Sequence, residues 1–160
     1  MEQASRLQDD GVIFRSMRLE DIPAICRIEA EAFATPWTAP AFRNELLYNH
    51  FAKYLVVEMY GNIIGYGGMW VIIDEAHVTN IAIASEYRGK KLGERLLARL
   101  QQVAISAGAT KMTLEVRVSN RIAQNLYKKM GFYPSGLRRN YYSDNHEDAL
   151  IMWADLANRG

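Results

Sequence analysis

A cluster of basic residues and glycines stands where a helical pattern begins. In the stretch EYRGKKLGERLLARL, residues 86–100, three cations surround two glycines just before leucines recur at helical spacing. A helix N-terminus offers unpaired N–H groups and a positive dipole end, and glycines let the backbone approach an anion. The stretch therefore predicts a pyrophosphate site made by Arg88, Gly89, Lys90, Lys91, Leu92, Gly93 and Glu94. On charge content alone, a solvated loop before a surface helix is the simpler interpretation.

The elements before this turn follow strand and helix patterns in alternation. The N-terminal part predicts a strand over 12–17 and a helix over 21–33, where isoleucines recur every three residues. A second helix over 38–49 begins with a hydroxyl cap at Thr38 and a proline in its first turn. A hairpin follows, with its turn at Tyr60-Gly61-Asn62. A strand over 76–84 then leads into the basic turn.

The elements after the turn complete a mixed α/β pattern. The helix that starts near Leu92 is predicted to end at Gly108, after a buried stripe that reaches Ala107. The alternating strand over 111–118 precedes a helix capped by Ser119 or Asn120, and two closing strands follow. We expect one domain over 11–160 after a flexible leader at 1–10.

Composition limits the kinds of protein that this chain can be. The 160 residues carry 19 Lys and Arg against 18 Asp and Glu, a net charge of +1, which argues against a broad nucleic-acid interface. One cysteine forms no internal disulfide, and the histidines are not at metal-ligand spacing, so we expect no metal site. The longest uncharged run is too short to span a membrane, and no signal peptide is present. A cytoplasmic protein is the simplest expectation, with an oligomeric state that the sequence does not specify.

The order of elements and two motifs resemble the GNAT acetyltransferase superfamily. The turn matches the family pattern Q/R-x-x-G-x-G/A at Arg88 and Gly93, while Lys91 takes the place of the middle glycine. The stretch SNRIAQNLYKKMGF resembles the helix that lies beside the pantetheine arm of the cofactor in that family. A Walker loop and the dinucleotide fingerprint are both absent from the sequence. The resemblance implies acetyl-CoA as cosubstrate and a mostly antiparallel sheet with about four flanking helices.

Three further stretches resemble one branch of this superfamily. FATPW, LEVRVSN and RRNYYSDNHEDALIM are similar to segments of the RimI family of bacterial ribosomal-protein-alanine N-acetyltransferases. The resemblance implies acetyl transfer to the N-terminal alanine of a small-subunit ribosomal protein. A broader N-terminal specificity is the nearest competing interpretation. A small-molecule amine acetyltransferase, for a polyamine or an antibiotic, and a non-catalytic acyl-CoA sensor remain further alternatives.

Acetyl transfer from a thioester to an amine requires a base for the amine and a proton for the departing thiolate. The resemblance places the base at Glu115 and the acid at Tyr127. Without the resemblance, an exposed strand glutamate paired with Arg117 or a neighbour is the simpler interpretation of Glu115. Tyr127 also fits the core of an amphipathic helix, and we expect it to serve both purposes.

The resemblance assigns the remaining contacts by position. Backbone groups of one strand are expected to pair with the pantetheine arm, namely those of Ile81, Ala82 and Ile83. Asn120 is expected to contact the same arm, with a plain helix cap as the alternative. The helix face with Lys91, Arg95 and Arg99 is either near the phosphorylated adenosine or simply solvated. Aromatic walls and an acidic rim are expected on the side of the basic acceptor peptide, from Trp37, Tyr141, Tyr142, Glu31 and Asp74. These side chains are equally explained as packing aromatics and common surface acids.

Overall fold

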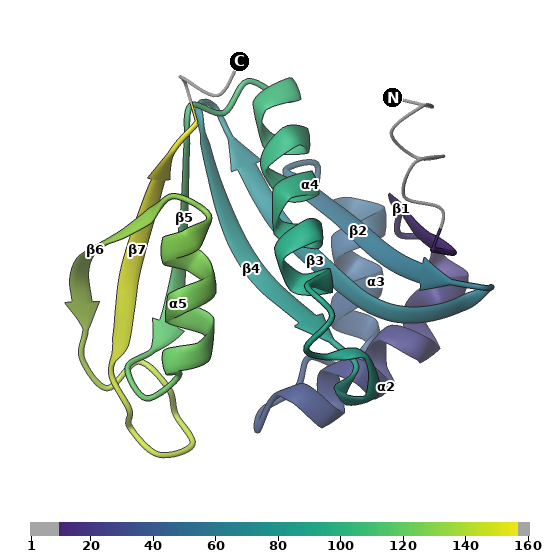
Figure 1. Cartoon of the computed structure of the whole chain (residues 1–160), viewed down its shortest axis with the longest axis horizontal. Helices are drawn as coiled ribbons and strands as arrows, with labels where there is room; N and C mark the ends of the chain where they lie inside the picture. The colour runs from purple at the N-terminus through teal and green to yellow at the C-terminus, as the bar shows by residue number, and fades with distance from the viewer. Residues whose placement is uncertain (1–9, 157–160) are drawn as a thin grey trace.

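In the computed structural model, which describes residues 10–156, seven strands form a single sheet in the order β1-β2-β3-β4-β5-β7-β6. Neighbouring strands are antiparallel except for β4 and β5, which are parallel. The mostly antiparallel mixed sheet that the sequence predicts is therefore confirmed (Figure 1). The strands are β1 (Val12–Ser16), β2 (Ala52–Met59), β3 (Asn62–Ile72), β4 (Glu75–Ile83), β5 (Lys111–Arg117), β6 (Phe132–Arg138) and β7 (Ala149–Asp155).

Four α-helices in the described part of the chain cover the two faces of the sheet. Helices α2 (Ile22–Ala32) and α3 (Ala39–Tyr48) pack on one face, and α4 (Leu92–Ser106) and α5 (Arg121–Lys129) pack on the other (Figure 1). Two short 3-10 turns, η1 (Leu19–Asp21) and η2 (Ser85–Tyr87), precede α2 and the basic turn. The number of helices agrees with the sequence prediction.

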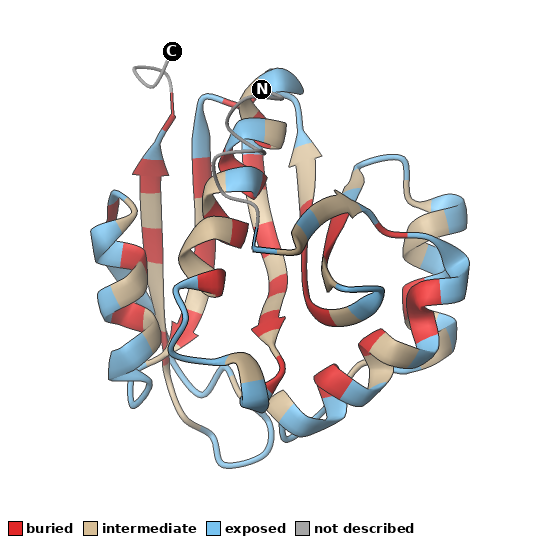
Figure 2. Cartoon of the chain, turned by 45° about the vertical axis from the view of Figure 1, so that its right-hand side comes forward, coloured by how far each residue is buried: buried red, intermediate tan, exposed pale blue. Residues whose placement is uncertain are grey.

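Each face of the sheet has its own hydrophobic core. In β4, Ala76 and Val78 belong to the core under α4, whereas Ala82 belongs to the core under α2. The change of side follows from a bulge, because Thr79 has no residue opposite it in β3, and one extra residue turns the alternation over. Figure 2 shows buried segments on the inward sides of the helices and at intervals along the strands.

Local signals in the sequence account for the starts of several elements. The Thr38 hydroxyl accepts a hydrogen bond from the Ala41 N–H at 3.3 Å, which confirms the predicted cap of α3. The β2–β3 hairpin turns where predicted, with left-handed φ values of 49° at Tyr60 and 85° at Gly61.

Two expectations about chain segments need comment. The helix α4 ends at Ser106, so the buried stripe stops before Ala107, which is exposed, and Gly108 follows with φ 99°. The predicted leader at 1–10 lies outside the described residues except for Asp10, whose carboxylate pairs with Arg95 at 2.8 Å. Among residues 10–156, no helix has the length and apolarity needed to cross a bilayer.

A glycine in β3 is required by a close aromatic neighbour. A Cβ at Gly68 would overlap the ring of Tyr54, whose hydroxyl donates a hydrogen bond to Glu45 at 2.8 Å and so fixes the ring. We expect Gly68→Ala to lower the free energy of unfolding by about 1–3 kcal/mol, measured by urea denaturation, because the buried ring must move.

Gly136→Ala is the matched control for this prediction. A Cβ at Gly136 would lie 3.9 Å from Ile151 Cδ1, an ordinary contact distance. Equal effects of the two substitutions would contradict the overpacking explanation.

Candidate active site

The parallel strands β4 and β5 stay together over only three residue pairs. Glu75, Ala76 and His77 pair with the segment 111–113, and beyond these pairs the two strands diverge (Figure 1). The rest of β4 therefore keeps its pairing with β3 on one edge and has no partner strand on the other within the described residues. An unpaired strand edge presents backbone N–H and C=O groups in a row, ready to bind an extended ligand.

The predicted pantetheine residues Ile81, Ala82 and Ile83 lie on this unpaired part of β4. Ile81 and Ile83 are half-buried against the core under α4. The Ile83 carbonyl accepts a hydrogen bond from Arg88 Nε at 3.1 Å. The Arg88 side chain thus holds the strand end, and its predicted contact with an anion stays a prediction.

The basic turn brings two left-handed residues just before α4. Gly89 has φ 80° and Lys91 has φ 63°, while Leu92 begins the helix. No side chain caps the first turn of α4, so its leading N–H groups remain available. Lys91 adopts the left-handed geometry that a glycine would take in the same place. Exposed Lys90 and half-buried Glu94 flank the turn.

Glu115 lies in a pocket on the α2–α3 face of the sheet. Its side chain is 9% exposed, accepts a hydrogen bond at Oε1 from His77 Nε2 at 2.8 Å, and lies 3.3 Å from Arg138 Nε at Oε2. Burial raises the pKa of Glu115, but His77 and the Arg138 guanidinium outweigh it, so the pKa is below its ordinary value. The Glu115 pocket has a volume of about 380 Å³ and is lined by Trp70, Ile72, Glu75, His77, Thr113, Glu115, Arg138, Ile151 and Trp153.

Tyr127 lies in the core on the other face of the sheet. It is 8% exposed, and its ring packs 5.7 Å from that of Phe132. Burial raises the pKa of Tyr127 to about 12, so its phenol is protonated near neutral pH and is a proton donor only. The expectation of a core tyrosine is confirmed.

Glu115 and Tyr127 are therefore on opposite faces of β5. Val116, next to Glu115, packs in the same core as Tyr127, because successive side chains of a strand point to opposite sides. Burial raises the pKa of Tyr142 to about 12, and the charge of Glu115 and the phenol of Tyr127 add smaller increases to this pKa.

The other predicted binding residues have structural partners. Asn120 caps α5 by accepting a hydrogen bond from the Ala123 N–H at 3.1 Å, as the simpler interpretation expects. Trp37 packs on Phe42 with ring centroids 5.4 Å apart. Glu31 accepts a hydrogen bond from the Ser85 N–H at 2.8 Å, which ties α2 to the turn after β4.

The β6–β7 connection carries the predicted tyrosines. Tyr141 and Tyr142 form an edge-to-face pair, and the Arg117 guanidinium lies 4.0 Å from the centre of the Tyr142 ring. Arg117 also pairs with Asp144 at 3.0 Å and with Glu147 at 3.2 Å, so one cation is shared between two acids of this connection.

Asp74 is the one predicted binding residue that the fold places elsewhere. It lies in the β3–β4 turn, at the end of β4 remote from Ile83, and its carbonyl accepts a hydrogen bond from the Thr110 N–H at 2.7 Å. The structure therefore groups Asp74 with the paired end of β4 and β5, away from their divergence.

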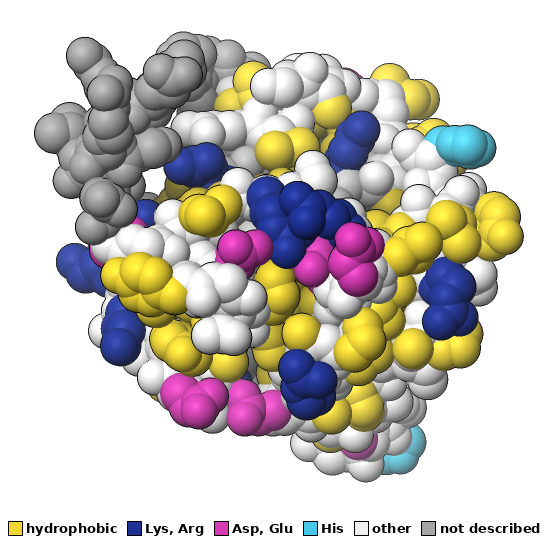
Figure 3. Space-filling model, turned by 90° about the vertical axis from the view of Figure 1, so that its right-hand side faces the viewer, with side chains coloured by type: hydrophobic (Ala, Val, Ile, Leu, Met, Phe, Trp, Pro, Cys, Tyr) yellow, Lys and Arg dark blue, Asp and Glu magenta, His cyan; other side chains and the backbone are white. Residues whose placement is uncertain are grey.

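The predicted basic face of α4 is used within the protein. Arg95 and Arg99 lie 5.4 Å and 4.9 Å from the centre of the Phe14 ring in β1, and Arg95 also pairs with Asp10. On the face of the molecule drawn in Figure 3, basic side chains lie among acidic and hydrophobic ones. The described surface in this view therefore shows no extended area of one charge sign.

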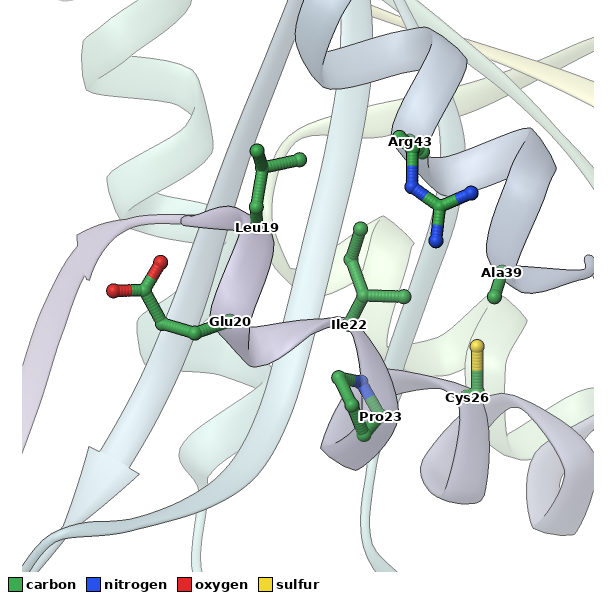
Figure 4. Close-up of a pocket in the computed structure, with 7 residues that line it drawn as sticks. All are labelled: Leu19, Glu20, Ile22, Pro23, Cys26, Ala39 and Arg43. Carbon is green, nitrogen blue, oxygen red and sulfur yellow. The ribbon is translucent and has the colours of Figure 1, made fainter.

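A larger cavity lies apart from the predicted residues. It has a volume of about 630 Å³ and separates η1 and the start of α2 from α3, with Cys26 and Arg43 on its walls (Figure 4). Burial raises the pKa of the Cys26 thiol, which lowers its reactivity. In residues 10–156, no group of three or more His, Cys, Asp or Glu side chains is arranged to hold a metal ion.

The sequence pattern of the Acetyltransferase (GNAT) family matches residues 22–132, which include β4, the basic turn, β5 and α5. The chain belongs to the GNAT acetyltransferase family. The resemblance seen in the sequence is thereby confirmed, and the arrangement of β4, the turn and α4 is that of a GNAT enzyme.

Relatives of this GNAT chain cover almost its whole length. A Bacillus subtilis (strain 168) protein, provisionally named a ribosomal protein bS18-alanine N-acetyltransferase, is 52% identical over 89% of this chain and 94% of its own. An N-alpha-acetyltransferase of Sulfurisphaera tokodaii is 34% identical over 98% of this chain and 100% of its own. The crystal structure of the ribosomal-protein-S18-alanine N-acetyltransferase from Escherichia coli superposes with a TM-score of 0.84 at 32% identity, over 93% and 96% of the two chains.

Two contacts of Glu115 were missed from the sequence. His77 and Arg138 contact Glu115 from β4 and β6, and they are 38 and 23 residues away from it along the chain. Only the register of the sheet brings them together, and no short motif contains both partners. A correct prediction of the sheet register would have paired His77 with Thr113, two residues before Glu115. That pairing would have indicated that His77 lies close to Glu115.

The left-handed geometry of Lys91 gives a stability prediction. Left-handed backbone costs a non-glycine residue about 1–2 kcal/mol. A glycine at Lys91 would avoid this cost, but the larger conformational entropy of glycine in the unfolded chain would offset part of the gain. We expect Lys91→Gly to raise the free energy of unfolding by about 0.5–1 kcal/mol in urea denaturation.

Lys90→Gly is the control, because Lys90 has no left-handed φ and a glycine there brings only its entropic cost. If Lys91→Gly destabilised the protein as much as Lys90→Gly, the strain at Lys91 would be disproved.

Proposed function

We propose that this protein is an acetyl-CoA-dependent N-terminal acetyltransferase that modifies the N-terminal alanine of the small-subunit ribosomal protein bS18, as RimI enzymes do. The observation that carries the proposal is the similarity, along nearly the whole chain, to bacterial relatives named for this activity. We place the reaction in the cytoplasm, where a bacterial ribosomal protein is made and modified. A broader N-terminal specificity is the second candidate, favoured by the similarity to the Sulfurisphaera protein.

Acetyl-CoA fits the residues that surround the divergence of β4 and β5. The unpaired edge at Ile81 to Ile83 matches the amides of a pantetheine arm, and the uncapped N–H groups at Leu92 to Glu94 match a pyrophosphate. When bound, acetyl-CoA supplies an acetyl group activated as a thioester. The left-handed residues Gly89 and Lys91 direct the backbone so that its N–H groups face the anion, and no metal is needed for this binding.

Glu115 serves as the base for the acceptor amine. An α-amine has a pKa of about 7.7–8.0, so much of it is protonated near neutral pH and must lose a proton before it attacks a carbonyl. The pKa of Glu115 is held below its ordinary value, so its carboxylate is ionised in this range and attracts the ammonium group. Glu115 takes the amine proton directly or through one water molecule.

Tyr127 returns a proton at the end of the reaction. Its phenol is protonated near neutral pH, well below the pKa of about 12 to which burial raises it, and it is the hydrogen-bearing group that we assign as donor to the thiolate leaving group. The two residues approach the reaction from opposite faces of β5. The acceptor peptide enters on the α2–α3 face, past Tyr141 and Tyr142, and the cosubstrate lies along β4 and α4.

A direct assay of thiol release tests the proposed specificity. Purified protein with acetyl-CoA should release CoA in the presence of short basic peptides that begin with alanine. We expect release at least tenfold faster than with matched peptides beginning with serine or methionine, with spermine, or with no acceptor, a difference of about 1.4 kcal/mol in the barrier. Equal rates with all peptides would support the broader specificity, and preference for spermine would overturn both protein-directed candidates.

A variant of the proposed base tests the mechanism. Glu115→Gln removes the proton acceptor, so kcat/KM for the alanine peptide should fall by about 10²–10⁴ at pH 7. The loss should shrink above about pH 8, because the free amine no longer needs a base. Glu20→Gln, an exposed carboxylate in η1, is the control and should leave the profile unchanged. A Glu115→Gln profile parallel to that of the wild type would exclude Glu115 as the base.

A further inference from the structure

His77 is placed to control the carboxylate of Glu115. Its Nε2 lies 2.8 Å from Glu115 Oε1, across the last residue pair that joins β4 and β5. The imidazole is also fixed from another strand, because the Trp70 ring meets it edge to face at 6.3 Å between centroids. Trp70 in turn donates its Nε1–H to Glu45 in α3 at 2.6 Å. A chain of contacts therefore anchors His77 to the helix above the sheet.

The two oxygens of Glu115 have different partners. Oε1 faces the half-buried and anchored imidazole, whereas Oε2 lies 3.3 Å from Arg138 Nε, a longer contact to a side chain that is 55% exposed. A carboxylate only accepts hydrogen bonds, so in this contact His77 Nε2 carries the hydrogen. Because the Arg138 side of this pair is exposed and the contact is the longer of the two, the cation at Oε2 is more easily displaced than the anchored donor at Oε1.

We propose that His77 is the positioning residue of Glu115: its Nε2–H holds Oε1, so that Oε2 is the oxygen that receives the amine proton once Arg138 has moved aside. The inference rests on the proposed role of Glu115 as base. The proton balance is simple, since one N–H bond of the ammonium breaks and one O–H bond forms at Oε2. His77 keeps its own proton throughout this step.

The surroundings of His77 contain few other ionisable groups. The charged or titratable side chains that line the same pocket are Glu75 on β4, Glu115 on β5 and Arg138 on β6, while β3 and β7 contribute apolar and tryptophan side chains. The hydrogen bond from His77 is also the foremost influence that lowers the pKa of Glu115 against the effect of burial. Removing it should therefore raise that pKa and leave the carboxylate free to rotate.

Two substitutions of His77 distinguish loss of its hydrogen bond to Glu115 from loss of its ring packing. His77→Gln retains an amide N–H close to the position of Nε2, whereas His77→Phe keeps a ring against Trp70 and removes the donor. We expect His77→Phe to lower kcat for the alanine peptide about tenfold, which is less than the loss expected for Glu115→Gln. The KM for acetyl-CoA should stay unchanged. His77→Gln should stay within about threefold of the wild type. His50→Gln, at an exposed site after α3, is the histidine control.

A double variant tests whether His77 acts through Glu115. If it does, adding His77→Phe to Glu115→Gln should cause no further loss of kcat, because the group being positioned is already gone. Carbon NMR can follow the titration of the Glu115 carboxyl. In the His77→Phe variant this carboxyl should titrate at a higher pH than in the wild type. Nitrogen NMR should show the hydrogen of neutral His77 on Nε2.

The outcomes are distinguishable from failure of the proposed function. If the wild type turns over no peptide, the proposed function fails, and the two NMR measurements still decide whether His77 holds Glu115. If the wild type is active and sensitive to Glu115→Gln, but the two losses of kcat multiply, His77 acts independently and the inference is overturned. Equal losses in His77→Gln and His77→Phe would overturn it as well.

Discussion

The early separation of two parallel strands is the constraint on which the site depends. Had β4 and β5 continued to pair, the free backbone groups of Ile81 to Ile83 would be hydrogen-bonded to β5 within the sheet. Their divergence leaves hydrogen-bonding groups that a pantetheine arm can complete. Glu115 and Tyr127, on opposite faces of the sheet, are the residues that the proposed mechanism assigns as base and acid, and in a continuous sheet the two faces would be separated beside them.

The divergence is held by packing on both faces. The bulge at Thr79 turns the alternation of β4 over, so Ala76 and Val78 face the core under α4, while Ala82 faces the core under α2 and Ile81 and Ile83 pack on the α4 side. Polar contacts add to this arrangement: Glu31 binds the chain at Ser85, and Arg88 binds the last carbonyl of β4. The strand end is thereby tied to α2 by Glu31 and to the basic turn by Arg88.

The sequence was sufficient to predict the elements, their order and the family, because hydrophobic periodicity, caps and turns are local signals. Thr38 and the hairpin at Gly61 are examples, since each contact lies within a few residues. The partners of Glu115 were not predictable in this way, because His77 and Arg138 meet it only through the register of three strands. Charge patterns also could not show that Arg95 and Arg99 lie over the Phe14 ring, a contact made across the fold although Arg99 stays exposed.

The backbone at Lys91 shows what the family pattern records at that position. The pattern is written with a glycine there, yet a lysine adopts the same left-handed torsion, at φ 63°. The letter in the pattern thus stands for a dihedral angle that glycine reaches at the least cost. A search that insists on the letter would reject chains whose turn has the required shape. The better criterion for membership at this position is the torsion itself, with the residue type as its most frequent consequence.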